Sequence, residues 1–158
     1  MKYWFVATYK INEIKRVESN LTNQSFDYYL PKIITRKHNS NPKEEVMFPG
    51  YIFINTNIDK YSSVRFTKGI KNIIKFGENI PTMTNEEIKT ISMVEKSSKL
   101  EPLVAEIKIG QEVNIRSGFL KGNIAKICSL PSKKRVGILL HILGSFKRVD
   151  ISEKDLKF

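Results

Sequence analysis

Met47-Phe48-Pro49-Gly50-Tyr51-Ile52-Phe53-Ile54 is the stretch that decides the fold, because it joins a Pro-Gly turn to an alternating aromatic and aliphatic strand. Side chains of a strand alternate between its two faces, so Tyr51 and Phe53 share one face and Ile52 and Ile54 share the other. If the isoleucines point into the core, the two rings face outward and form a docking patch. The alternative is a strand buried on both faces, and these residues alone leave the two alternatives about even.

The composition describes a basic globular protein. The chain has 158 residues, 41% of them hydrophobic, which is enough for one ordinary domain or two small ones. Its net charge of +11 favours polyanionic partners such as DNA, RNA or the ribosome. Residues 107–158 carry +7 of that charge, and this step predicts two modules. The alternative is a lysine-rich solvated surface without a polyanionic partner.

Several classes of protein are excluded by what the sequence lacks. No apolar run approaches the roughly 20 residues of a membrane span. The apolar run within the first ten residues is too short for a signal peptide. We therefore expect a cytoplasmic protein that does not contact membranes. The single cysteine, Cys128, excludes an internal disulfide. The two histidines, His38 and His141, form no metal-ligand cluster and have no evident catalytic partner. We therefore expect no metal, no cofactor and no enzymatic activity.

The first hundred residues alternate between strand and helix signals. Ile11, Ile14 and Leu21 follow helical spacing, and Thr84-Asn85-Glu86-Glu87 fits the capping box of a second helix. Proline interrupts a third segment at Pro31, which indicates an edge strand. The expected elements are strands at 3–9, 26–34 and 72–76, a polar loop at 36–45, a short helix at 59–64, and a linker beginning near 97.

The C-terminal segment carries two periodicities. Residues 110–127 alternate apolar and polar positions about the Gly118–Gly122 turn, which is typical of a small bent β-barrel. The apolar positions of the next segment also fit one face of a helix; these are Ile138, Leu139, Ile142, Leu143 and Phe146. In a short apolar run such ambiguity is most often noise.

The order of these elements resembles the NusG family of transcription elongation factors. The resemblance rests on residues 47–54, on Thr67-Lys68-Gly69-Ile70, on Phe76-Gly77 and on the Gly118–Gly122 turn, and it covers almost the whole chain. It implies an α+β N-terminal domain over 1–98, with an antiparallel four-stranded sheet flanked by helices. It further implies a linker over 99–108 and a KOW domain over 109–158.

Within the family, the chain looks most like the operon-specific RfaH branch. Trp4, Lys10, Arg16 and Leu21 match it, as do Glu45 and the segments 135–140 and 146–158. In that branch the KOW domain folds as an α-helical hairpin packed on the N-terminal domain, and becomes a five-stranded β-barrel after recruitment. The resemblance therefore explains the mixed periodicity, because a sequence that folds both as a helical hairpin and as a barrel has to satisfy both periods.

The resemblance also implies roles for particular residues. Contacts with the clamp helices of the RNA polymerase β′ subunit fall at Phe48, Tyr51, Phe53 and Phe76. Contacts with the non-template single-stranded DNA fall at Lys10, Arg16, Asn20, Thr67 and Lys68. Asn20 replaces a histidine of the RfaH branch, so the DNA element can differ, and Lys60-Tyr61-Ser62 replaces a motif that touches the β-subunit gate loop.

The two domains are expected to meet in a closed form. Glu45 and Arg135 match a carboxylate and a guanidinium that bridge the domains, where a partly buried ion pair fixes one arrangement. Ile138, Leu139, Ile142 and Leu143 would then compete with polymerase for Tyr51 and Phe53. Asn123 occupies a position that is aromatic in the helical hairpin of the RfaH branch, which would weaken the closed form.

The implied function is operon-specific transcription elongation and antitermination by a monomer. The chain would join polymerase at a DNA pause signal, suppress pausing and termination, and couple transcription to translation through a small-subunit ribosomal protein. Two alternatives stay open. One is a general NusG-type elongation factor with a permanent barrel, and the other is a ribosome-associated KOW protein that binds rRNA.

Overall fold

The computed structural model describes residues 2–36, 39–100, 102–104 and 132–147. The chain divides into two compact units, and it crosses between them three times, after Leu30, after Phe48 and after Asn85. The first unit comprises Met1–Leu30 and Pro49–Asn85, and the second comprises Pro31–Phe48 and Glu86–Phe158. The predicted division at residues 98 and 109 stays a prediction, because residues 105–131 and 148–158 lie outside the described part.

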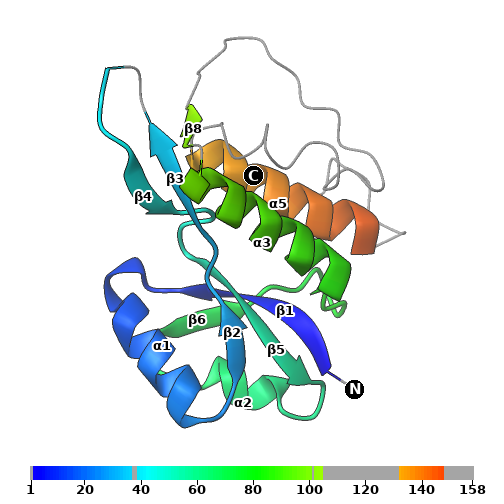
Figure 1. Ribbon diagram of the computed structural model, residues 1–158. Coiled ribbons are helices and arrows are strands. Elements are labelled where there is room, and N and C mark those ends of the chain that lie inside the picture. Colours follow the sequence, from blue (N-terminus) through cyan, green and yellow to red (C-terminus); the bar gives the residue numbers. More distant parts are fainter. Residues whose placement is uncertain (1, 37–38, 101, 105–131, 148–158) are drawn as a thin grey trace. The chain divides into compact units, whose positions relative to one another are not determined.

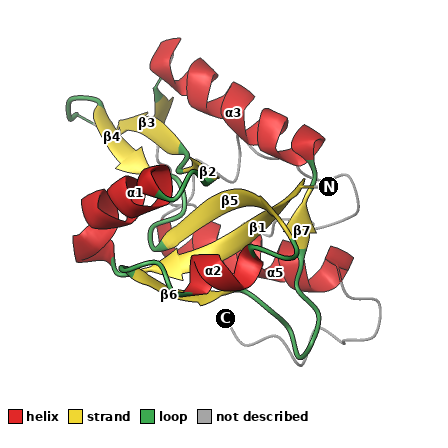
Figure 2. Cartoon of the chain, turned by 90° about the horizontal axis from the view of Figure 1, so that it is seen from below, coloured by secondary structure: helices red, strands yellow, loops and turns green. Residues whose placement is uncertain are grey.

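The first unit is built on an antiparallel sheet (Figures 1 and 2). Its strands run in the order β2 (Asp27–Tyr29), β5 (Tyr51–Asn57), β1 (Lys2–Tyr9) and β6 (Ile70–Ile73), and β7 (Thr82–Met83) also pairs with β1. The long pair β1 and β5 is in register from Lys2 opposite Asn57 to Thr8 opposite Tyr51. The α+β class with an antiparallel sheet and helices is thereby confirmed.

Of the two alternatives left open for this strand, the structure favours burial on both faces at the centre of β5. Ile52, Phe53 and Ile54 are consecutive and each is at most 1% exposed. The ring of Phe53 lies 6.4 Å from that of Tyr29, and Tyr51, Asn55 and Asn57 of the same strand are partly exposed. Strand β5 pairs with β1 along one edge and with β2 along the other, so the hydrogen-bonding edges of its centre are both covered.

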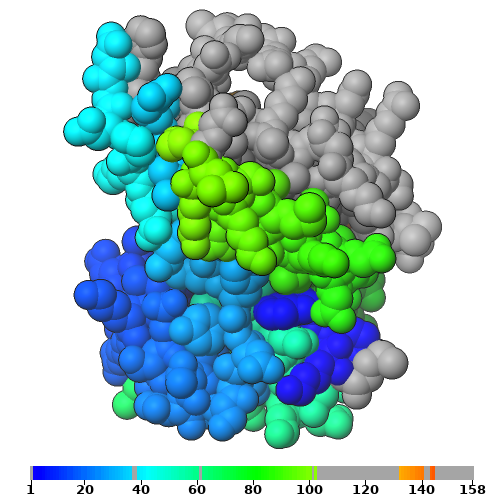
Figure 3. All heavy atoms as spheres, in the orientation of Figure 1, coloured from blue at the N-terminus to red at the C-terminus, as the bar shows by residue number. Residues whose placement is uncertain are grey.

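The helices of the first unit lie close to their predicted positions. A 3₁₀ turn, η1 (Ile11–Glu13), leads into α1 (Ile14–Asn23), whose Val17 and Leu21 are fully buried. Figure 3 shows α1, in blue, at the surface of the molecule. The short helix α2 (Tyr61–Arg65) begins two residues later than predicted.

Two strand predictions need correction. The expected edge strand over 26–34 is two strands of different sheets, β2 and β3 (Lys32–Arg36). They are separated at Pro31, which has no N–H to donate and restricts the backbone of the residue before it. The strand expected at 72–76 lies at Ile70–Ile73, and Phe76 instead forms an isolated bridge with Asn79.

The described residues of the second unit form a three-stranded sheet and two long helices. Strand β3 pairs antiparallel with β4 (Lys43–Val46) and parallel with β8 (Leu103–Val104). Helix α3 (Asn85–Leu100) extends into the segment predicted to be a linker. The hydroxyl of Ser98 accepts a hydrogen bond from the backbone N–H of Ile34 at 3.0 Å, which fixes α3 to β3.

The C-terminal segment showed both a strand and a helix periodicity in its sequence. In the structure, its residues Ser132–Lys147 form helix α5. Leu139 and Leu143, one turn apart, are at most 2% exposed. The Gly118–Gly122 turn and Asn123 lie outside the described residues, as do the expected barrel strands before residue 132. In the described part of the chain, no helix is both long and apolar enough to cross a membrane.

Candidate functional site

The five residues predicted to contact DNA come from neighbouring segments of the first unit. Lys10 follows β1, Arg16 and Asn20 lie on α1, and Thr67 and Lys68 lie in the turn between α2 and β6. The backbone N–H of Lys10 donates to the carbonyl of Gly69 at 2.9 Å, and the Asn20 amide donates to the carbonyl of Lys68 at 3.4 Å. We call these five residues the basic face.

An acidic side chain stands between the two cations at one end of the basic face. Glu13 Oε1 accepts a 2.8 Å bond from Arg16, and Glu13 Oε2 lies 3.8 Å from Lys10 Nζ. The Glu13 side chain is 26% exposed, whereas the two cations are more than half exposed. Glu13 therefore orients both cations toward solvent, and a bound phosphate would compete with it for them.

The turn that carries Lys68 approaches α1 too closely for any side chain. Gly69 has φ +94°, in the left-handed region that favours glycine, and a Cβ at this position would lie 2.4 Å from Val17 Cγ2. This close approach brings the carbonyls of Lys68 and Gly69 within hydrogen-bond reach of Asn20 and Lys10. Gly69 thus sets the position of Lys68 relative to α1.

Thr67 lies inside the turn, and its predicted role changes accordingly. It is only 3% exposed, and its hydroxyl shares hydrogen bonds of 3.2 and 3.4 Å with the amide group of Gln24. A hydroxyl held in this way positions the turn and does not present itself to DNA. No sequence signal marks Gln24 as its partner, because the two residues meet only through the fold.

Two tyrosines of the first unit resist ionisation. Burial raises the pKa of the Tyr9 hydroxyl, the charge of Glu18 raises it further, and a hydrogen bond with the Gly50 backbone partly opposes both. Burial alone raises the pKa of Tyr51. The backbone N–H of Tyr9 also donates to the carbonyl of Gly50 at 3.0 Å, which attaches the Pro49-Gly50 turn to the end of β1.

The four residues predicted to bind polymerase differ in exposure. Phe48, in the second unit, is 2% exposed, and Phe53, in the first, is fully buried. Tyr51 and Phe76, both in the first unit, are partly exposed. Phe48 and Phe53 are therefore not accessible to a partner in this conformation.

The most buried charge in the described part of the chain belongs to Arg135, on α5. Its side chain is 2% exposed, and it donates from Nε to the carbonyl of Met47 at 2.7 Å. Its Nη2 donates to Glu45 Oε1 at 2.6 Å and more weakly to the carbonyl of Val46 at 3.5 Å. One guanidinium thus binds three consecutive residues at the end of β4, and we call this arrangement the Arg135 latch.

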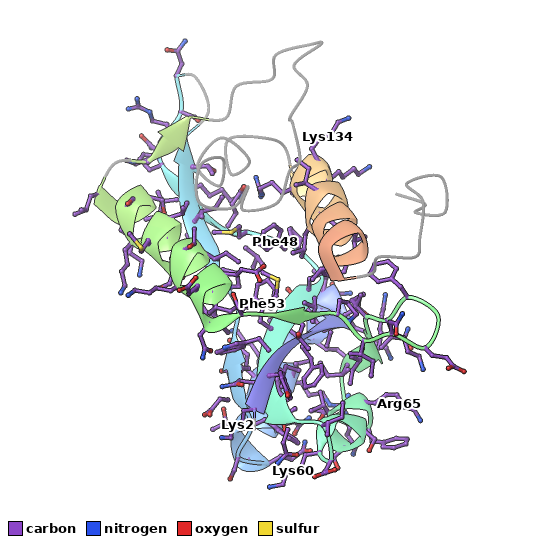
Figure 4. All side chains as sticks on the ribbon, turned by 90° about the vertical axis from the view of Figure 1, so that its right-hand side faces the viewer. Lys2, Phe48, Phe53, Lys60, Arg65 and Lys134 are labelled. Carbon is purple, nitrogen blue, oxygen red and sulfur yellow. The ribbon has the colours of Figure 1, made fainter. Side chains whose placement is uncertain are left out.

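The latch places α5 against the segment that leads to Phe48. Leu139 and Leu143 are buried and Ile138 is partly buried, whereas the side chain of Ile142 lies outside the described part. In Figure 4, Phe48 projects into the space between α3 and α5. The predicted pair Glu45 and Arg135 is therefore in direct contact, within one compact unit.

Comparisons with known proteins identify a family for the chain. A family model described as "Transcription termination factor nusG" matches residues 2–92. A solved structure of NusG from Thermotoga maritima, described as "Domain interaction in Thermotoga maritima NusG", is similar at 18% sequence identity and a TM-score of 0.42, covering 72% of this chain and 69% of that one. Among curated proteins, none matches the chain.

The described residues contain no group of three or more metal-ligand side chains.

Proposed function

The chain belongs to the NusG family of transcription factors, and from that premise we propose that it acts on particular operons and not on every transcript. In this proposal it binds the β′ clamp of RNA polymerase and the exposed non-template strand. It then suppresses pausing and termination, and its C-terminal domain recruits a small-subunit ribosomal protein. It performs no catalysis of its own.

The observation that carries the proposal is the Arg135 latch. An operon-specific factor has to stay off polymerase until a signal is met, whereas a general factor does not. Phe48 is 2% exposed, and Arg135 binds the carbonyl of Met47 immediately before it. We infer that release of α5 uncovers Phe48, so that the latch makes clamp binding conditional.

The basic face supports the choice of DNA as the signal. Lys10, Arg16 and Lys68 are exposed cations gathered on one part of the first unit. Phosphate neutralisation by such residues gives affinity for a displaced strand, and contacts with unstacked bases give specificity. In this proposal the protein binds the closed clamp of polymerase more tightly than the open clamp. It can shift polymerase toward the closed state only by that difference in affinity.

The test uses reconstituted elongation complexes with and without candidate leader DNA. Wild-type protein is expected to bind only complexes that expose the right element. Glu45→Ala removes the anion of the latch and should permit binding to complexes that lack the element. Glu44→Ala, an exposed neighbour, is the matched control and should behave as wild type. If Glu45→Ala binds element-free complexes as poorly as wild type does, conditional binding through the latch is wrong.

The rival with a permanent barrel is tested by NMR of the full-length protein. Helix α5 spans Ser132–Lys147, so helical shifts are expected there. Strand shifts throughout 112–152 would instead favour a general NusG-type factor whose C-terminal domain does not change. Co-purification with ribosomes in place of polymerase would favour the third reading, in which the basic C-terminal segment binds rRNA.

A further inference from the structure

The most exposed aromatic residue in the described part of the chain lies beside the basic face. Phe66 is 74% exposed, and the guanidinium carbon of Arg65 lies 5.1 Å from the centre of its ring. Phe66 directly precedes Thr67, and Lys68 follows. Figure 4 shows Arg65 on the outer side of α2.

The backbone around this ring is well fixed, so its exposure is a property of the folded state. Its neighbours Val64 and Thr67 are at most 3% exposed. The N–H of Phe66 donates to the carbonyl of Ser63 at 3.2 Å, and the N–H of Thr67 donates to that of Val64 at 3.0 Å. A large apolar ring is thus held in water by a hydrogen-bonded turn, and covering it with a partner would be favourable.

The charges around the ring indicate which chemistry would cover it. The segment 65–71 holds three exposed cations, Arg65, Lys68 and Lys71, and no carboxylate. A surface of this kind attracts phosphates, and an aromatic ring within it offers a flat face on which a base can stack. The adjacent guanidinium adds a second planar, charged group that also stacks on bases.

We propose that Phe66 and Arg65 form a stacking platform for an unpaired base of single-stranded DNA. The platform extends the basic face beyond the residues named above and rests on the proposed function. Base stacking on an aromatic side chain tolerates any sequence, because every base has a π face. The platform therefore strengthens and orients strand binding, and sequence selection is left to other contacts.

The test measures binding of the full-length protein to a fluorescent oligothymidylate of about 12 nucleotides, enough for one typical site. Phe66→Leu keeps an apolar side chain but removes the π face, and it should weaken binding about 5- to 100-fold. Phe66→Trp keeps the π face, so its affinity should stay near that of wild type. Its added indole fluorescence should be quenched by the bound base.

Salt dependence separates stacking from charge. Phe66→Leu should leave the slope of log affinity against log salt unchanged, whereas Lys68→Gln should reduce that slope by about 0.7, the value for one phosphate contact on a single strand. Equal weakening by Phe66→Leu and Phe66→Trp would overturn the platform. Because the ring is exposed, the variants should melt as wild type does, and the melting curve checks this.

Polymerase without DNA provides the remaining control. If Phe66→Leu weakens binding of the latch-released Glu45→Ala protein to DNA-free polymerase, the ring contacts protein and the platform is wrong. If Lys68→Gln weakens DNA binding and Phe66→Leu does not, the platform alone fails and the proposed function stands. If wild-type protein binds neither the oligonucleotide nor any elongation complex, both fail.

Discussion

The Arg135 guanidinium and the Glu45 carboxylate form a 2.6 Å ion pair in which the cation is 2% exposed and the anion 37%. Removing the anion leaves the buried cation without this carboxylate, and removing one partner of a buried pair costs more than replacing both. Glu45→Gln is therefore expected to destabilise the protein by about 2 kcal/mol, less than for a fully buried pair because Glu45 is partly solvated. Chemical denaturation measures the loss, and hydrogen exchange should accelerate in α5.

Glu44→Gln is the control for that prediction, because it makes the same chemical change one residue away on β4. Its side chain is exposed, and exposed charges contribute little to stability. If the two variants lose equal stability, or if exchange in α5 is the same in both, the ion pair does not hold the helix.

A second prediction concerns Thr67, whose hydroxyl meets Gln24 inside the turn. Thr67→Val keeps the shape but leaves the Gln24 amide without this partner, at a cost of about 1 kcal/mol. Thr67→Ser keeps the hydroxyl and should lose less. Single-strand affinity should fall in Thr67→Val without any change in its salt slope, because no phosphate contact is removed. Lost affinity in Thr67→Val without any loss of stability would show that Thr67 contacts DNA directly.

Sequence patterns predicted individual helices and strands better than they predicted which faces of those elements are buried. The period of Ile11, Ile14 and Leu21 predicted α1, because helical spacing reports one face directly, although Ile11 itself is exposed in the turn before the helix. Alternation in β5 could not tell whether a second face is covered, so the burial of Phe53 became known only from the structure. The pairing of Glu45 with Arg135, 90 residues apart, was predicted from the family resemblance and not from periodicity.

The candidate site shows the same limit. Lys10, Arg16 and Lys68 are exposed as expected, since long charged side chains rarely bury without a partner. Thr67 belongs to the same predicted group but faces inward, because a short hydroxyl is as easily satisfied inside a turn as outside it. Phe66 gave no sequence signal, because an isolated aromatic residue is more often buried than exposed.

A third prediction follows from the tyrosines. The pKa values of Tyr9 and Tyr51 are raised above 10.0 in the folded protein. Above that pH the unfolded chain releases protons that the folded chain still holds, so stability is retained below pH 10 and falls as pH rises beyond it. Denaturation midpoints at alkaline pH should fall less steeply in Tyr9→Phe than in wild type. Tyr3→Phe, at an exposed tyrosine, is the control.

A fourth prediction tests the close approach at Gly69. Gly69→Ala adds a Cβ 2.4 Å from Val17 Cγ2 at a backbone φ of +94°, so both a clash and backbone strain oppose it. The expected loss is about 2–4 kcal/mol, with weaker single-strand binding because Lys68 is displaced. Combining Gly69→Ala with Val17→Ala relieves the clash, so the two losses should be less than additive. Full additivity would show that the turn moves away from α1 without resistance.

The last prediction concerns Gly137, in the interior of α5, where an added Cβ would meet no atom of the described residues within 4 Å. Glycine disfavours a helix relative to alanine by about 1 kcal/mol, and serine lies between the two. Gly137→Ser and Gly137→Ala should therefore stabilise α5 in that order, measured by hydrogen exchange. If release requires α5 to leave its helical form, recruitment to element-bearing complexes should weaken in the same order, by up to about 5-fold. Slower exchange in α5 with unchanged recruitment would mean that the helix undocks intact, and the latch alone would then control access to Phe48.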